Sequence, residues 1–164
     1  MPDLPQRKNL RLQDFDYDSP GAYFVTICTQ NRKCILSEIS VGADALGGPT
    51  VTLTHTGQIV EKYILSTEDI PGVSVDKYVI MPNHVHLLLT VENTGGPPRA
   101  SAPTTALVPN AVSALKRLVN RELGTDIWQR SYYDHVIRNS LDYREIWQYI
   151  ENNPARWAED CYAP

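Results

Sequence analysis

The sequence predicts an α+β domain with the ferredoxin-like order β-α-β-β-α-β, in which an antiparallel sheet has helices on one face, followed by a further C-terminal helix. Two observations predict this class. Short segments rich in β-branched and aromatic residues alternate with longer segments that carry apolar residues at helical spacing, in the order that this fold requires. The 164 residues also suffice for one hydrophobic core and are too few for two comfortable ones.

Five segments are predicted to be strands. Residues 22–30 (AYFVTICTQ) are rich in aromatic and β-branched residues and are bounded by turn formers. Residues 75–81 and 84–91 are two short apolar segments, and the Pro-Asn pair between them predicts a tight turn or a bulge. Residues 132–137 are a further candidate, and residues 51–53 are expected to form a short edge strand.

Three segments are predicted to be helices, because each begins with a capping residue and continues with apolar residues at helical spacing. The candidate caps are Thr54 or Thr56 for the first helix, Asn110 for the second, and Asn139 or Ser140 for the third. Gly124 is expected to end the second helix. Pro154 is expected to stop the third helix near Asn153, since proline disrupts a helix and restricts the residue before it.

The predicted domain covers residues 22–157, between a polar N-terminal tail at 1–21 and a short C-terminal tail at 158–164. Residues 93–109 are rich in Gly, Pro, Ala, Ser and Thr, which predicts a flexible loop within the domain. The polar first ten residues predict no signal peptide. No apolar stretch approaches the roughly 20 residues needed to cross a bilayer, so we expect no membrane partner.

The cysteine content bears on the cellular compartment, and the distribution of charge bears on the class of binding partner. Three cysteines without a CxxC pair argue against a disulfide scaffold or a cysteine zinc site, and they predict a cytoplasmic protein. The net charge is −4, but residues 36–94 hold two basic and seven acidic residues, so the rest of the chain is nearly balanced. The net charge therefore does not exclude a nucleic-acid partner.

The first candidate site is the pair His84 and His86. Residues two apart on a strand point to the same face, so both imidazoles lie side by side while Val85 points into the core. Neighbouring neutral imidazoles chelate a divalent cation well. A pair of structural histidines on a strand explains the same spacing equally well.

The second candidate site lies on the last predicted helix. Tyr149 and Asn153 are four residues apart and share one helical face, so a phenol and an amide can reach the same site on the sheet. The amide oxygen is a hard ligand that suits Mg²⁺ or Mn²⁺. Without further context, packing of the tyrosine and capping by the asparagine are the commoner explanation of this pattern.

The third candidate is the polar face of the second predicted helix. Lys116, Arg117 and Arg121 lie opposite its apolar stripe, where they can follow a phosphate backbone. A solvated helix face is the commoner explanation of such a group of charges.

Three segments together resemble one known family. Residues 78–89 (YVIMPNHVHLLL) resemble the HUH motif of single-strand endonucleases. Residues 128–157 (WQRSYYDHVIRNSLDYREIWQYIENNPARW) resemble the C-terminal signature of the REP-associated tyrosine transposases, which are relatives of the small single-tyrosine insertion-sequence transposases. Residues 23–32 (YFVTICTQNR) resemble the first strand of that family, and the resemblance extends from about Arg7 to Trp157.

The resemblance implies a metal-dependent endonuclease and transposase that cleaves and rejoins single-stranded DNA through a 5′-phosphotyrosine intermediate. His84 and His86 match the two metal-binding histidines of the family, and Asn153 matches its third, amide-bearing ligand, for Mg²⁺ or Mn²⁺. Tyr149 matches the nucleophilic tyrosine. The glycine- and proline-rich residues 93–109 are not part of the family's motifs.

The resemblance also implies a substrate, which is a DNA hairpin of a palindromic repeat or of an insertion-sequence end. The basic residues proposed to contact it are Arg7, Lys8, Arg11, Lys116, Arg117 and Arg121. Family relatives include homodimers that exchange helices as well as monomers, so the resemblance leaves the oligomeric state open.

Two other functions compete with this interpretation. Histidine-triad nucleotide hydrolases use three alternating histidines, but the third alternating position here is Leu88, so that function fails at its central residue. A non-catalytic nucleic-acid-binding module, descended from such a transposase and built on the same sheet, is the remaining alternative. Such a module would need no metal and would tolerate Tyr149→Phe.

Overall fold

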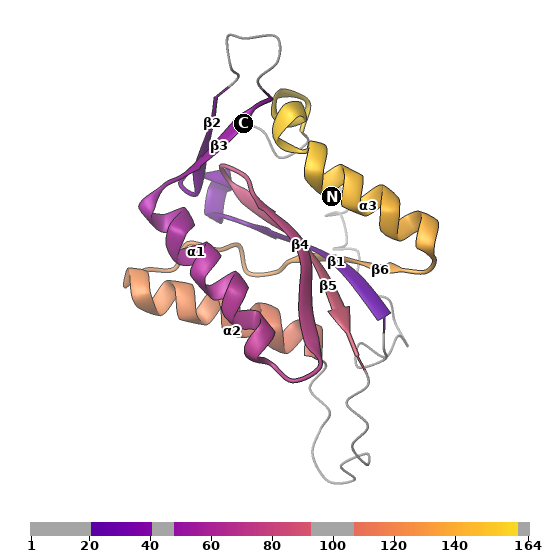
Figure 1. The fold of residues 1–164 in the computed structure, drawn as a ribbon. Coiled ribbons are helices and arrows are strands. Elements are labelled where there is room, and N and C mark those ends of the chain that lie inside the picture. The colour runs from indigo at the N-terminus through magenta and orange to yellow at the C-terminus, as the bar shows by residue number, and fades with distance from the viewer. Residues whose placement is uncertain (1–20, 41–47, 93–106, 161–164) are drawn as a thin grey trace, which may run out of the picture.

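The computed structural model describes residues 21–40, 48–92 and 107–160. Its elements in chain order are β1 (Gly21–Cys28), the short 3-10 helix η1 (Gln30–Arg32), β2 (Ser37–Ser40), β3 (Thr50–Leu53), α1 (His55–Ser66), η2 (Thr67–Asp69), β4 (Val73–Ile80), β5 (His84–Val91), α2 (Leu107–Leu123), β6 (Tyr133–Ile137), α3 (Ser140–Asn152) and η3 (Pro154–Glu159) (Figure 1). No helix within these ranges is long and apolar enough to cross a membrane.

Four strands form one antiparallel sheet in the order β4-β5-β1-β6. The helices α1 and α2 cover one face of this sheet, and α3 lies against the opposite face (Figure 1). The chain order β1, α1, β4, β5, α2, β6 is the β-α-β-β-α-β order that the sequence predicts, and α3 is the additional C-terminal helix. The predicted fold class is therefore confirmed.

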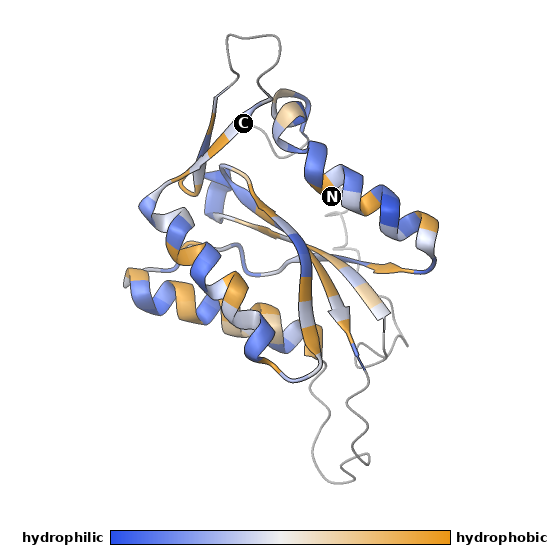
Figure 2. Ribbon diagram, in the orientation of Figure 1, coloured by the Kyte–Doolittle hydropathy of each residue, from blue (hydrophilic) through white to orange (hydrophobic). Residues whose placement is uncertain are grey.

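The hydrophobic core lies between the sheet and the pair α1 and α2. Alternate residues of the two central strands point into it, because successive side chains of a strand face opposite sides. These residues are Tyr23, Val25 and Ile27 of β1 and Val85, Leu87 and Leu89 of β5, all buried. The helices contribute residues such as Val60, Ile64, Val112, Leu115 and Val119. By contrast, much of the visible length of α3 is hydrophilic (Figure 2).

Helix ends follow the capping rules closely. Thr54, not Thr56, caps α1, and its hydroxyl accepts a hydrogen bond from the Gly57 backbone N–H. Asn139 caps α3 by accepting from the backbone N–H of Asp142 at 2.8 Å. Gly124 follows the last residue of α2 with φ of +71°, a left-handed conformation that favours glycine.

The predicted start of the second helix is wrong. Residues 107–109 are already helical, so Asn110 lies inside α2 and is not its cap. A proline within the first turn is tolerated there because the first N–H groups of a helix have no intrahelical acceptor. Val108 is buried and extends the apolar face of the helix. Residues 93–106 of the predicted flexible loop lie outside the described residues, as do Arg7, Lys8 and Arg11.

A separate β-hairpin and a tight turn accompany the four-stranded sheet. The predicted edge strand is β3, but it pairs with β2, which was not predicted, in a separate two-stranded hairpin. Between β4 and β5 the backbone N–H of Met81 donates to the His84 carbonyl at 2.9 Å, which confirms a tight turn. A register shift lies elsewhere, between Val75 and Lys77.

Candidate active site

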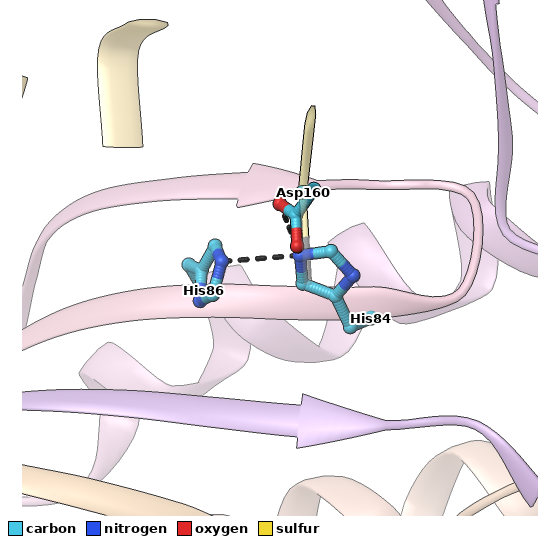
Figure 3. A group of neighbouring side chains, drawn as sticks. All are labelled: His84, His86 and Asp160. Carbon is cyan, nitrogen blue, oxygen red and sulfur yellow. Dashed lines mark hydrogen bonds and ion pairs between the residues drawn. The ribbon is translucent and has the colours of Figure 1, made fainter. Parts of the chain in front are cut away.

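Two imidazoles meet on the face of the sheet that α3 covers. His84 and His86 are alternate residues of β5, and Val85 between them belongs to the core on the other face. The two Nε2 atoms are 3.0 Å apart, and the residues are 0% and 1% exposed (Figure 3). The predicted side-by-side pair is therefore present, and it is fully buried.

The Nδ1 atom of each imidazole contacts a polar side chain on the side away from the other ring. His84 Nδ1 lies 2.8 Å from the side-chain oxygen of Asn83. His86 Nδ1 lies 2.8 Å from the hydroxyl of Thr26, which is its directly opposite partner on β1. With both Nδ1 atoms engaged by neighbours, both Nε2 atoms point to a common space.

The electrostatic environment keeps both rings neutral. Burial lowers the pKa of His84 from its usual 6.5 to about 4, although Asp160 and Asn153 act in the opposite direction. Burial, and next the neighbouring His84, lower the pKa of His86 well below 6.5. Neutral imidazole is the form that binds a metal ion, so the pair needs no net loss of a proton at pH 7 to act as a ligand set.

A carboxylate that the sequence analysis missed completes this cluster. The side chain of Asp160 is 2% exposed, and its Oδ2 lies 3.7 Å from His84 Nε2. One ligand atom from each of His84, His86 and Asp160 lies within 4.8 Å of the others (Figure 3). A buried carboxylate beside two neutral rings is costly without a positive charge, so this donor set fits a divalent cation.

Asn153 approaches the same cluster from the end of α3. It is 3% exposed and is the C-terminal cap of the helix. Its side chain is close enough to His84 to raise the pKa of that ring, yet its Oδ1 is buried and has no hydrogen-bond partner among the described residues. A buried amide oxygen without a partner is unfavourable, and an ion of the Mg²⁺ type would satisfy it.

Tyr149 lies beside the imidazole pair. Its ring centroid is 5.3 Å from that of His86, with the rings inclined at 62°, and 5.9 Å from that of Phe24 in an edge-to-face arrangement. Tyr149 is also 39% exposed, so its ring contacts the cluster while part of it faces solvent. The structure therefore brings together all four residues predicted from motif spacing, which are Tyr149, His84, His86 and Asn153.

A cavity of about 420 Å³ adjoins the tyrosine and the buried carboxylate. Its lining residues are Glu145, Gln148, Tyr149, Asn152, Asn153, Arg156, Glu159 and Asp160. Three of these are acidic and one is basic, and the exposed pair Arg156 and Glu159 lies 3.4 Å apart. A phosphate would be repelled by this lining unless a cation were bound in it.

Residues 21–153 match the family model described as Transposase IS200 like. The chain belongs to this family. Over 180 aligned residues it is 31% identical to an uncharacterized protein of Haemophilus influenzae, covering 96% of this chain and 93% of that protein. Over 141 residues it is 24% identical to the REP-associated tyrosine transposase of Escherichia coli K12, covering 85% of this chain and 70% of that protein.

The fold of this family member is similar to that of a solved REP-associated tyrosine transposase bound to a REP hairpin. The TM-score is 0.59 at 23% sequence identity, and the match covers 83% of this chain and 67% of the solved one. The family resemblance found from the motifs is thus confirmed, together with the fold class.

Polar contacts help to hold α3 on the sheet. Within α3 only Ile150 is fully buried. The Tyr143 hydroxyl donates to Asp76 of β4 at 2.7 Å, and the Lys77 amine lies 4.5 Å from the centre of the Trp147 ring. Burial, with the hydrogen bond to Asp76, raises the pKa of Tyr143 to about 12. The contacts of Tyr143 and Trp147 with β4 therefore help to position Tyr149, on the same helix, beside the imidazoles.

The basic residues of α2 are not near the imidazoles. Arg117 and Arg121 are exposed on α2, which covers the opposite face of the sheet. The Lys116 amine donates to backbone carbonyls before β6, at 2.7 Å to Gln129 and 3.2 Å to Ser131. Lys116 therefore fixes this connection, while DNA binding by the two arginines stays a prediction.

Proposed function

We propose that the chain is a metal-dependent single-stranded DNA endonuclease and transposase that cleaves and rejoins DNA through a 5′-phosphotyrosine intermediate. The observation that carries this proposal is the placement of Tyr149 beside His86, one of two buried, neutral imidazoles that share a space with Asp160 and Asn153. Family membership supports it, because Tyr149, His84, His86 and Asn153 match the nucleophile and ligands that the family resemblance implies.

The residues present fit a divalent cation, Mg²⁺ or Mn²⁺. Nε2 of His84 and of His86 and Oδ1 of Asn153 are the ligands proposed from the sequence, and Asp160 adds a carboxylate oxygen. All four are electron-pair donors, so a cation would satisfy them together. When bound, the cation would withdraw negative charge from the scissile phosphate and orient it.

Tyr149 supplies the nucleophile. Its phenolic oxygen forms a bond to the phosphorus and loses its proton, while the bond from phosphorus to the 3′-oxygen breaks and that oxygen gains a proton. The products are a 5′-phosphate ester on Tyr149 and a free 3′-hydroxyl. The ester keeps the energy of the phosphodiester, so a 3′-hydroxyl can reverse the step and rejoin the strand without ATP.

The substrate that we propose is single-stranded DNA next to a hairpin, such as a palindromic repeat. The similar solved protein is bound to a REP hairpin, which supports this class of substrate. A flexible strand can bend a phosphate into the cavity beside Tyr149 at less cost than duplex DNA, which resists bending.

Labelled hairpin DNA with a single-stranded flank tests the proposal. With Mn²⁺ or Mg²⁺, we expect a covalent protein–DNA adduct that survives denaturing electrophoresis, is suppressed by a chelator and is lost in Tyr149→Phe. A label on the 3′ side of the cut should enter the adduct, and a label on the 5′ side should not, because Tyr149 retains the 5′-phosphate. Tyr133→Phe, which changes an exposed tyrosine of β6, is the matched control and should retain the adduct.

An adduct that persists in Tyr149→Phe would assign the nucleophile to another tyrosine and overturn the proposal. Hairpin binding that is independent of metal and yields no adduct would instead support the non-catalytic nucleic-acid-binding module.

A further inference from the structure

The Thr26 hydroxyl contacts His86 at a position where the fold needs no hydroxyl. Thr26 lies in the middle of β1 between Val25 and Ile27, and it is buried against both neighbouring strands. Valine has a similar shape and, like threonine, favours strand positions. The contact of the hydroxyl oxygen with His86 Nδ1, at 2.8 Å, is therefore what distinguishes threonine from valine here.

The proton on His84 is fixed by Asn83. The side-chain nitrogen of Asn83 donates to the backbone carbonyl of Arg32 at 3.4 Å, which leaves its oxygen facing His84 Nδ1 at 2.8 Å. An oxygen there can only accept, so Nδ1 of His84 carries the proton. His84 is neutral, and its Nε2 therefore presents a lone pair to the cluster.

His86 must then carry its proton on a different nitrogen in the metal-free protein. The two Nε2 atoms are 3.0 Å apart, and two lone pairs at that distance would repel each other. The contact is a hydrogen bond when His86 Nε2 holds the proton and donates to His84. His86 Nδ1 is then a bare acceptor, and the Thr26 hydroxyl donates to it.

A divalent cation requires the opposite tautomer of His86, because Nε2 can bind a metal only through its lone pair. The ring then loses the proton on Nε2 and gains one on Nδ1, by exchange with water, and its charge stays at zero. The Nδ1–H now needs an acceptor. A hydroxyl can rotate and accept at the same position where it donated before, which neither a carbonyl nor a methyl group can do.

We propose that Thr26 is a positioning residue whose hydroxyl hydrogen-bonds either tautomer of His86 and so permits the imidazole pair to exist both without and with a bound cation. The inference rests on the metal site in the proposed function. A cation on Nε2 would polarise the Nδ1–H, so the hydrogen bond to Thr26 is stronger in the metal-bound state than in the metal-free state. Loss of the hydroxyl therefore lowers metal affinity, and groups hydrogen-bonded to ligand histidines typically change that affinity by about 10- to 100-fold.

Spectra of ¹⁵N-histidine-labelled protein test the tautomers directly, because the two ring nitrogens differ in shift when one carries the proton. Without metal, we expect the proton on Nδ1 of His84 and on Nε2 of His86. With saturating Mg²⁺, which is diamagnetic, the proton of His86 should move to Nδ1. A metal-free protein with His86 already protonated on Nδ1 would overturn the inference.

Mn²⁺ binding to three variants, followed by the electron spin resonance of the free ion, tests the hydroxyl itself. Thr26→Val should raise the dissociation constant about tenfold or more, and Thr26→Ser, which keeps the hydroxyl, should stay within about threefold of wild type. Thr67→Val removes another buried threonine hydroxyl, bonded to the Tyr63 carbonyl at the end of α1, and should leave Mn²⁺ affinity unchanged.

Wild-type affinity in Thr26→Val would overturn the inference, as would equal losses in the serine and valine variants. These measurements use no DNA, so they are separate from the test of cleavage. A wild-type protein that shows the tautomer exchange but forms no DNA adduct would refute only the proposed reaction.

Discussion

The Asp160 carboxylate reaches to within 3.7 Å of His84 Nε2, although Asp160 follows Tyr149 by eleven residues and belongs to neither motif. Removing its charge in Asp160→Asn should weaken Mn²⁺ binding by about tenfold or more, because the affinity of an oxygen-ligand site depends on the number of charged ligands. Calorimetric titration with Mn²⁺ measures this. Glu159→Gln changes an exposed carboxylate that lines the same cavity, and its affinity should remain near wild type. Equal affinity losses in the two variants would contradict a direct role for Asp160.

The stability of the metal-free protein should fall in mild acid. Burial lowers the pKa of His84 to about 4 and that of His86 well below 6.5, so the unfolded chain binds more protons than the folded chain between about pH 6.5 and 4. The free energy of unfolding therefore decreases as the pH falls through this range, by on the order of 3 kcal/mol for one such imidazole. Urea unfolding at several pH values measures the slope. The double variant His84→Gln/His86→Gln should show a smaller slope, and an unchanged slope would contradict neutral burial of the pair.

Asn153→Leu should separate stability from metal binding. Its Oδ1 is buried without a hydrogen-bond partner among the described residues, so an apolar side chain of similar size should leave the metal-free melting temperature unchanged or raise it. The same variant lacks a proposed ligand, so added Mn²⁺ should raise its melting temperature less than that of wild type. Thermal unfolding with and without Mn²⁺ tests both effects. A metal-induced rise as large as in wild type would exclude Asn153 from the ligand set.

The arginines of α2 should contribute to DNA affinity through charge alone. Arg117 and Arg121 are exposed and lie apart from the imidazole cluster. The double variant Arg117→Ala/Arg121→Ala should bind single-stranded hairpin flanks more weakly and should reduce the slope of log affinity against log salt by about 1.4, which is two phosphate contacts. Its melting temperature should match that of wild type.

Lys116 provides the contrast to these two arginines. Lys116→Met should lower stability, because the Lys116 amine holds backbone carbonyls before β6. If the double arginine variant shows an unchanged salt slope, α2 does not contact DNA.

The parts of the site that were predicted from sequence depend on short-range geometry. His84 and His86 are two apart on a strand, and Tyr149 and Asn153 are four apart on a helix, so their shared faces follow from the periods of those elements. The order of strands and helices then brings the two pairs to the same side of the sheet. The capping residue Asn139 was also recognisable, because its side chain bonds the backbone three residues later.

The parts that were missed depend on long-range contacts. Asp160 reaches the cluster only because the chain turns at Pro154 and continues through η3, with Trp157 packing its ring 6.0 Å from that of His84. No periodicity connects Asp160 to the imidazoles. The helical start of α2 was missed because Pro109 is a loop signal in isolation, although the first turn of a helix accepts it.

The two faces of the sheet carry different kinds of side chain. The face toward α1 and α2 is packed mostly with aliphatic side chains, whereas the face toward α3 holds the imidazoles, and polar contacts such as Tyr143 to Asp76 help to attach α3. A chain with this fold can therefore lose the proposed nucleophile or a proposed ligand by mutation and still inherit an intact scaffold. Family members that have lost the proposed activity should retain the aliphatic layer long after the opposite layer has diverged.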